Sequence, residues 1–377
     1  MKFLFASPHC LIDETNGAAI SIRTLLAGLV NLGHEVLVMG ATVYDSEEAA
    51  RRGPSSPSDS KFFSVNWHGI EYRLLSTKYW VRDLVSSIEG EAFEFYFTEL
   101  IESYQPDVLI TFGGYLLERS ILRESRAHGI RNVFYLANPN YYHSRSFRDV
   151  DVMVTDSYST AKLYQERLKV SLHPVGKFID KLSVIAKHRQ PNFITFVNPS
   201  LEKGVSMVAQ LALMCRKALP QVRFLVVESR GKWDDSLKVF GLSSDDFPNV
   251  VVYPPQRDMR EVFSKTRMLL VPSFWHESGS RLIIESLLNG IPVLVASHGG
   301  SAEFVGGGGF LIDIPVDSRM NPDKLVDEKI ALPWFNVLKS LMVDSHSYEN
   351  AVLLATQAAQ QYDLEKQVSK FLDIVLN

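Results

Sequence analysis

The stretch "MLLVPSFWHESGSRLIIESLLNGIPVLVAS", from Met268 to Ser297, predicts a strand, a loop, a helix and a second strand in direct succession. The apolar run MLLVPS predicts a strand that ends at about Ser273. The segment RLIIESLLN predicts a helix, which stops at Gly290 with Pro292 just beyond it. The second strand, IPVLVAS, is again almost entirely apolar, as expected of a parallel strand covered on both faces.

The same alternation of short apolar runs and longer amphipathic segments extends over the chain. Helical patterns cover 18–32, 115–128, 159–168 and 205–218. The apolar runs between them are KFLFAS, HEVLVMG, PDVLITFGG, RNVFYLAN, DVMVTDS, NFITFVNP, VRFLVVES and NVVVYPP. Strand–helix alternation of this kind is typical of α/β proteins with doubly wound sheets.

The length of the chain and one polar stretch indicate two domains. A chain of 377 residues exceeds the size at which single cores stop growing. The polar stretch at 185–191 separates two series of strands, so we expect Rossmann-like domains at 1–185 and 186–350, with 351–377 as a C-terminal helix packing back toward the first domain. Ligands of such sheets bind at the carboxyl ends of the strands, which predicts a site in a central cleft. The least organised region is 41–76, in which the polar stretch SEEAARRGPSSPSDSK, residues 46–61, is expected to be an exposed loop.

Charge, cysteine content and hydropathy exclude several classes of protein. A net charge of −4 gives no sign of nucleic-acid binding. Two cysteines are too few for a disulfide framework and fit a reducing compartment. No run of about 18 apolar residues is present, and the apolar N-terminal run is too short for a signal peptide. We therefore expect a cytoplasmic protein, with peripheral contact at the inner face of the membrane left open.

The loop before the helix of the opening stretch has the composition of a nucleotide site. Its segment 278–280, Ser-Gly-Ser, lies at the helix start, where free N–H groups favour an anion and small side chains let a phosphate approach. Glu285, one to two turns into the helix, suits a ribose diol, and Glu277 suits a sugar hydroxyl. The alternative is that Glu285 only forms a helix ion pair with Arg281.

These residues resemble a known family. "ESGSRLIIESLLNGIPV" resembles the E-x7-E signature of the large retaining group of GT-B glycosyltransferases, the glycosyl transferases group 1 or family 4-like group. Three further segments resemble that group in the same order: NGAAISIRTLLAGLVNLGHEVLV, NPSLEKG and SHGGSAEFVGGGG. The resemblance spans nearly the whole chain and implies a GT-B fold, with two Rossmann-like domains facing a cleft.

The resemblance also implies roles for individual residues. Glu277 and Lys203 are expected at the catalytic centre, against the transferred sugar and the diphosphate. Donor binding is expected from Gly17, Asn198, Arg230, Ser278, Gly279, Ser280, Arg281 and Glu285, with Gly299, Gly300 and Glu303 in the segment that follows the next strand. The chain departs from the family at Asn198, where an arginine is usual, and Arg230 or Arg281 is expected to compensate. On the acceptor or sugar side, Asn138 stands near the family's usual histidine, and His143 is the nearest histidine.

A metal-binding motif is present but is interpreted as structural. Asp149 and Asp151 match the D-x-D pattern of a different glycosyltransferase fold, yet VDVMVTDS predicts a buried strand. No metal and no cofactor are therefore expected.

The implied function is transfer of a hexose-type sugar from a nucleotide diphosphate donor, UDP favoured over GDP, with retention. The acceptor is a hydroxyl of a glycan, a lipid-linked glycan or a small molecule. The alternatives are a non-catalytic GT-B-like partner subunit and a nicotinamide-dependent enzyme. Against the second, no G-x-G-x-x-G follows the first strand.

Overall fold

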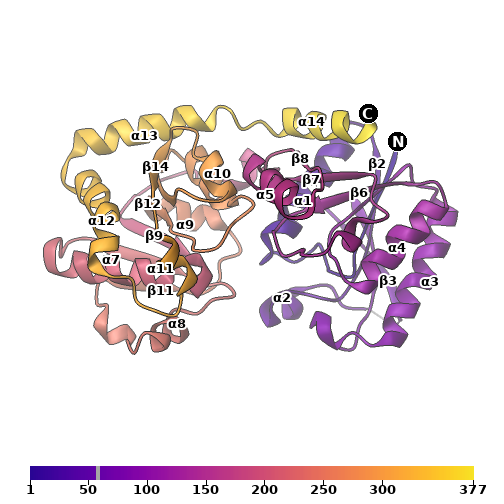
Figure 1. Cartoon of the computed structure of the whole chain (residues 1–377), viewed down its shortest axis with the longest axis horizontal. Helices are drawn as coiled ribbons and strands as arrows, with labels where there is room; N and C mark the ends of the chain where they lie inside the picture. Colours follow the sequence, from indigo (N-terminus) through magenta and orange to yellow (C-terminus); the bar gives the residue numbers. More distant parts are fainter. Residues whose placement is uncertain (57–59) are drawn as a thin grey trace. The chain divides into compact units, whose positions relative to one another are not determined.

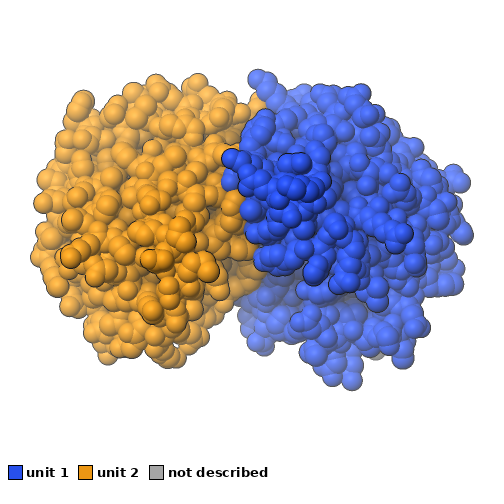
Figure 2. Space-filling model, in the orientation of Figure 1, with its two compact units in different colours: residues 1–178, 364–377 blue, residues 179–363 orange. Residues whose placement is uncertain are grey.

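The computed structural model describes residues 1–56 and 60–377, which form two compact units (Figure 2). Unit 1 comprises Met1–Phe178 and Leu364–Asn377, and unit 2 comprises Ile179–Asp363. The chain thus passes from unit 1 to unit 2 after residue 178, where the sequence had suggested 185, and returns after residue 363.

Unit 1 is built on a sheet of eight strands in the order β3-β4-β2-β1-β5-β6-β7-β8 (Figure 1). Neighbouring strands are parallel, apart from the antiparallel pair β3 and β4. The strands are β1 (Lys2–Ala6), β2 (Glu35–Ala41), β3 (Phe62–Trp67), β4 (Ile70–Leu75), β5 (Val108–Thr111), β6 (Arg131–Leu136), β7 (Val152–Thr155) and β8 (His173–Pro174).

Helices cover both faces of this sheet because its strands are apolar on both faces. In β1, Phe3 and Phe5 join one buried cluster, with helices α1 and α14, while Leu4 and Ala6 join a second, with α3 and α4. The helices of the unit are α1 (Gly17–Asn31), α2 (Glu47–Arg52), η1 (Arg82–Leu84), α3 (Ser87–Tyr104), α4 (Leu116–Ala127), η2 (Ser144–Phe147), α5 (Tyr158–Leu168) and α14 (Leu364–Leu376).

The exposed loop expected over 46–61 is wrong in part, because helix α2 lies within it. The rest of the region 41–76 contains a hairpin formed by β3 and β4. The hairpin turn is His68-Gly69, and both residues have positive φ, 50° and 81°. A two-residue turn of this kind matches the twist of the strands, so the alternating sequence around His68-Gly69 carried a signal that we overlooked. Residues 57–59 of the expected loop lie outside the described residues.

Unit 2 contains a sheet of six parallel strands in the order β11-β10-β9-β12-β13-β14. Counted along the unit, this is the order 3-2-1-4-5-6 of a doubly wound sheet, and its strand order reverses between β9 and β12. The strands are β9 (Phe193–Val197), β10 (Arg223–Val227), β11 (Val250–Tyr253), β12 (Thr266–Val271), β13 (Val293–Ala296) and β14 (Gly309–Ile312).

Two helical layers also cover the sheet of unit 2. Helices α7 and α12 pack into one buried cluster, and α10 and α13 pack into another. The helices are α6 (Lys181–Val184), η3 (Leu201–Lys203), α7 (Val205–Ala218), α8 (Trp233–Val239), η4 (Ser244–Asp246), α9 (Met259–Lys265), α10 (Arg281–Leu288), η5 (Gly300–Phe304), α11 (Val316–Met320), α12 (Glu328–Val343) and α13 (Ser345–Ala359).

The C-terminal part of the chain contributes to both units. Residues 351–377, expected as one helix, comprise the end of α13 in unit 2 and the whole of α14 in unit 1. Among the described residues, no helix is long and apolar enough to cross a membrane. The two α/β sheets, parallel apart from the β3–β4 pair, confirm the predicted fold class.

Candidate active site

The point where the strand order of unit 2 reverses brings two loops together. One loop follows β9 and contains Asn198 and Lys203, and the other follows β12 and contains Glu277. Ligands of doubly wound sheets bind outside the carboxyl ends of the strands at such a reversal. The sheet topology therefore places two residues predicted from separate motifs, Lys203 and Glu277, where a ligand is expected.

Glu277 is the centre of this arrangement. The Lys203 Nζ lies 2.7 Å from the Glu277 Oε1, and the hydroxyl of Ser273 donates to the same oxygen. The Ser301 hydroxyl lies 3.4 Å from Oε2, and the Gly300 N–H donates to the Glu277 carbonyl at 2.7 Å. The buried carboxylate thus has three partners, a cation and two hydroxyls, which offset the cost of burying its charge and leave room for a further donor.

The loop that carries Lys203 is fixed against the end of β12. Gly204, directly after the lysine, has φ +82°, and a Cβ there would lie 1.9 Å from the Pro272 carbonyl oxygen. The Phe274 N–H donates to the Glu202 carbonyl at 2.8 Å. The Lys203 Nζ also lies 5.8 Å from the centre of the Trp275 ring, within reach of a cation–π attraction. Lysine and glutamate are therefore held together by the backbone as well as by their charges.

Glu285 and Arg281 form the helix ion pair that the sequence left as an alternative. The Glu285 Oε1 lies 3.1 Å from both the Nε and the Nη2 of Arg281, one turn earlier on α10. Both side chains are largely buried, with 8% and 10% of their surface exposed. Such a pair does not exclude a ribose, because a carboxylate has about four lone-pair positions.

The side chains of the segment 278–280 are small for a reason that the sequence did not reveal. A Cβ on Gly279 would lie 2.1 Å from Cε2 of Phe304, so this glycine is required by packing. Ser278 and Ser280 are both buried, and the Ser280 N–H donates to the Ser301 hydroxyl at 3.1 Å. Through these contacts the start of α10 is connected to η5, the segment that begins at Gly300.

A histidine lies beside the same segment. His298 follows β13, and among the described residues neither of its buried ring nitrogens makes a hydrogen bond of good geometry, although the backbone of Phe274 and Trp275 lies close to the ring. Burial lowers the pKa of His298, and the nearby guanidinium of Arg319 lowers the pKa further. The imidazole is therefore expected to be neutral at pH 7, and its buried nitrogens are polar groups that a ligand or water can satisfy.

Asn198 and the loop after β10 are in contact. Asn198 has a left-handed backbone with φ 63°, and its side-chain Oδ1 accepts the Gly231 N–H at 2.8 Å. Arg230, which precedes Gly231, has an exposed side chain. The predicted donor-binding residues Asn198 and Arg230 therefore lie on two loops that touch.

The remaining predicted residues, Gly17, Asn138 and His143, belong to unit 1. Gly17 is the first residue of α1, whose start is capped by the Asn16 side chain, with its Oδ1 accepting from the N–H groups of Ala18 and Ala19 at 2.8 and 3.1 Å. Asn138 follows β6, and His143 is an exposed residue before η2. Their roles on the acceptor or sugar side stay predictions.

Unit 1 contains one group of side chains that the sequence reading missed. His9, Asp13 and Asp45 follow β1 and β2 and place one ligand atom each within 4.8 Å of one another, close enough to hold a metal ion. Their carboxylates already accept hydrogen bonds, at 2.9 Å from the Asp45 N–H to Asp13 and at 2.6 Å from Asn16 Nδ2 to Asp45. A histidine three residues after the first strand, followed by Asp13, was the available signal.

The two aspartates of the D-x-D motif lie beside Asn132. Asp149 and Asp151 precede β7 and so lie at the amino edge of the sheet, opposite the edge where ligands bind. The Asp151 carboxylate accepts the N–H of Asn132 at 2.8 Å, and the Asn132 side chain donates to the Asp149 carbonyl at 2.7 Å. The pair thus connects β6 to β7.

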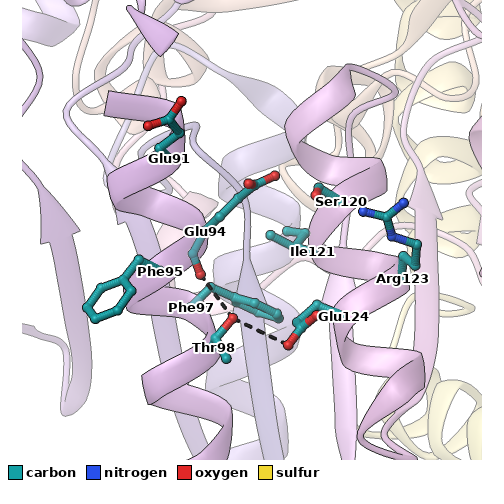
Figure 3. Close-up of a pocket in the computed structure, with 9 residues that line it drawn as sticks. All are labelled: Glu91, Glu94, Phe95, Phe97, Thr98, Ser120, Ile121, Arg123 and Glu124. Atoms are coloured by element: carbon teal, nitrogen blue, oxygen red, sulfur yellow. Dashed lines mark hydrogen bonds between the residues drawn. The ribbon is translucent and has the colours of Figure 1, made fainter. Parts of the chain in front are cut away.

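A groove of about 320 Å³ lies on the outer side of unit 1, between α3 and α4 (Figure 3). It is lined by three glutamates, Glu91, Glu94 and Glu124, and by Thr98, whose hydroxyl lies 3.5 Å from Glu124 and 3.2 Å from the Glu94 carbonyl. Because these helices cover a face of the sheet, the groove is separate from the strand ends. Arg123 is the one cation among the residues that line the groove, and a nucleotide diphosphate requires more than one.

Comparison with solved structures identifies the fold of the chain. Sucrose-phosphate synthase from Thermosynechococcus elongatus superposes with a TM-score of 0.71 and 14% identity over 99% of this chain and 97% of that one. HepE from Anabaena, solved with UDP-glucose, gives 0.70 and 15% over 99% of both chains. The pneumococcal O-GlcNAc transferase GtfA, solved with UDP and GlcNAc, gives 0.70 and 11% over 100% and 98%. The chain has the GT-B fold.

A sequence match lies in unit 2. Residues 180–328, which make up most of that unit, match the profile described as "Glycosyl transferases group 1". No curated protein matches the chain significantly in sequence. The resemblance inferred from the motifs is confirmed, and the nicotinamide alternative is set aside by the family match.

Proposed function

We propose that the protein transfers a hexose unit from a UDP-sugar to a hydroxyl group, with retention of the anomeric configuration. The observation that carries the proposal is the Lys203–Glu277 pair at the strand reversal of unit 2. The choice of UDP is supported by HepE, solved with UDP-glucose, and by GtfA, solved with UDP and GlcNAc. The acceptor is a glycan, a lipid-linked glycan or a small molecule, and peripheral membrane contact of a cytoplasmic enzyme is part of the proposal.

The proposed roles follow from charge. In the reaction, the bond between the anomeric carbon and the diphosphate breaks, a bond to the acceptor oxygen forms, and the acceptor proton passes to the leaving phosphate. Lys203 stabilises the negative charge that grows on the diphosphate as that bond breaks. Glu277 accepts hydrogen bonds from the sugar. Its hydrogen bond to Lys203 holds both side chains in position for the donor.

The experiment that tests the proposal begins with binding. Thermal unfolding in the presence of UDP, GDP, uridine and UDP-glucose should show stabilisation by UDP and UDP-glucose, because ligands that bind the native state raise the melting temperature by mass action. Slow hydrolysis of UDP-glucose, with water as acceptor, should follow, and NMR of the first product should show the α-anomer. Binding without any turnover, with any acceptor, would favour the non-catalytic partner subunit. The β-anomer would contradict retention.

A second test concerns metals. The carboxylates of Glu277 and Glu285 are already paired with Lys203 and Arg281, so these cations can take the role that a divalent ion has in other transferases. Hydrolysis of UDP-glucose should therefore survive EDTA. Loss of activity in EDTA with recovery in Mg²⁺ would contradict this part of the proposal, and an Asp13→Asn variant would show whether the His9 group is the metal site.

A further inference from the structure

The outer side of α3 in unit 1 is acidic and partly apolar. Its exposed side chains follow helical spacing and are Ile88, Glu91, Phe95, Glu99 and Glu102. The helix contains glutamates but neither lysine nor arginine. Ile88 and Phe95 are 70% and 66% exposed, and the Phe95 ring points away from α4 (Figure 3). The outer side of α3 therefore presents negative charge around two large apolar groups.

The outer side of the neighbouring helix α4 is basic. Its outward side chains, again at helical spacing, are Leu116, Arg119, Arg123 and Arg126. The two glutamates of α4 do not offset this charge on the outer side. Glu118 is buried and paired with Arg82, and Glu124 faces α3, where the Thr98 hydroxyl lies 3.5 Å from its carboxylate (Figure 3). Two adjacent helices thus present opposite charges to the solvent.

The two helices lie in a definite register. Both run back from the carboxyl edge of the parallel strands, so they point in the same direction. Thr98 lies beside Glu124, and one turn later Glu102 lies 3.9 Å from His128. The two residues of each pair are 26 positions apart in sequence. A residue of α3 therefore lies level with the residue of α4 that is 26 positions later.

This register makes the surface complementary to itself. At that offset, Arg119 lies in height between Glu91 and Phe95, and Arg123 lies between Phe95 and Glu99. A two-fold axis parallel to the helices, above the groove between them, keeps these heights and places α3 of one copy on α4 of another. Each arginine then faces glutamates of the other copy, and the same contact forms twice.

The charges of this surface are not engaged inside the chain. In the part of the chain that the structure describes, no ion pair or side-chain hydrogen bond involves Glu91, Glu99, Arg119 or Arg123. A small charged ligand would be attracted by one helix and repelled by the other, and an anionic membrane would be repelled by α3. A second copy satisfies both helices at once.

We propose that the outer surface of α3 and α4 is an interface between two copies of this chain. In this arrangement the Phe95 ring reaches α4 of the other copy between Arg119 and Arg123, where arginine stems and guanidinium planes pack on an aromatic ring. The contact is small, because α4 has 12 residues and is about 18 Å long. We therefore expect a weak dimer, with a Kd of about 10–100 µM. The proposal lies outside the transfer site and does not depend on the proposed function.

Sedimentation velocity of the full chain, without any ligand, tests whether the dimer exists. Between about 5 and 200 µM, a range that spans the expected Kd, the protein should pass from monomer to dimer. The dimer should weaken as NaCl rises from about 50 to 500 mM, since salt screens exposed charges. A chain that stays monomeric at the highest concentration and lowest salt would overturn the proposal.

Charge exchange tests which surface is used. One variant combines Glu91→Lys with Glu99→Lys, and the other combines Arg119→Glu with Arg123→Glu. Each variant alone brings like charges together and should dimerise at least tenfold more weakly than the wild type. An equal mixture of the two should form a heterodimer, because each reversed helix then meets its opposite. All four substitutions in one chain should restore the homodimer for the same reason.

The matched control changes the same charge on unit 2. Glu328→Lys with Glu349→Lys, on the exposed sides of α12 and α13, should dimerise like the wild type. Wild-type dimerisation in both reversed variants would overturn the assignment of the interface to α3 and α4. Loss of the dimer with no recovery in the mixture or in the fourfold variant would overturn the pairing of α3 with α4.

Discussion

The Lys203 ammonium lies 2.7 Å from the Glu277 carboxylate, so the cation assigned to the diphosphate and the carboxylate assigned to the sugar are bonded to each other. Glu277 is the more buried partner, with 7% of its side chain exposed against 26% for Lys203. A diphosphate that binds Lys203 competes with Glu277 for the same ammonium. The two residues must therefore be tested with ligands that separate phosphate from sugar.

Lys203→Met should weaken UDP binding by about 1.5–3 kcal/mol and leave uridine binding nearly unchanged, because only UDP has the charge that the ammonium contacts. Isothermal titration with both ligands measures the difference. Lys238→Met, an exposed lysine in α8 paired with Asp235, is the control and should affect neither ligand. Equal losses for UDP and uridine would show that Lys203 supports the fold of the site rather than the diphosphate.

Glu277→Gln should keep or raise the affinity for UDP, because the variant frees Lys203 from its carboxylate partner. Turnover of UDP-glucose should fall at least tenfold, since UDP has no sugar to hold whereas the reacting donor has. The comparison requires UDP affinity and hydrolysis rate on the same preparation. A wild-type rate in this variant would show that Glu277 has no role in catalysis.

Glu285→Gln should weaken uridine and UDP alike, because a ribose diol is present in both and an amide is a poorer acceptor than a carboxylate. Arg281→Met removes the other half of the ion pair and should leave uridine affinity intact. Melting temperature, uridine affinity and UDP affinity are measured for both variants. If the two variants lose stability equally and both bind uridine like the wild type, the pair is structural.

Gly204→Ala should destabilise unit 2 strongly. An alanine at this position must adopt the left-handed region, which costs roughly 1–2 kcal/mol, and must also move the Pro272 carbonyl, 1.9 Å from its Cβ. Gly241→Ala is the matched control, since that glycine has φ +69° with nothing within 4 Å and is subject to the backbone effect alone. Urea unfolding of both variants should give a larger loss at position 204. Equal losses would show that the loop can move to accommodate the alanine side chain without further cost.

The lowered pKa of His298 predicts that the stability of the protein depends on pH. Its folded pKa is lowered by burial first and by Arg319 second, while the unfolded histidine has its ordinary pKa of about 6.5. The unfolded state therefore binds the proton first as pH falls, so the unfolding free energy decreases below about pH 6.5 and stops decreasing below the folded pKa. Melting temperatures at pH 5 and pH 7.5 should differ less in His298→Gln than in the wild type. An identical difference would contradict a neutral buried histidine.

The sequence predicted those parts of the structure whose pattern is local. The helix at 205–218 matches α7, and the strands on both sides of Glu277 match β12 and β13, because apolar runs and glycine stops lie within single elements. The hairpin of β3 and β4 was missed since its polar surroundings masked a two-residue turn. The contact of Gly279 with Phe304 and that of Asn198 with Gly231 could not be predicted, because each joins segments far apart in sequence.

Helix α14 has a consequence for the order in which the protein forms during synthesis. Its Val368 packs so closely on α1 that a Cβ at Gly28 would lie 2.6 Å from the valine Cγ2, and its Phe371 is fully buried in the core of unit 1. The ribosome makes this helix only after the whole of unit 2, whose residues all lie between the two segments of unit 1. Until α14 has been made, unit 1 therefore exposes the apolar surface of α1 that α14 covers. Unit 2, whose residues are all translated earlier than α14, can complete its fold first.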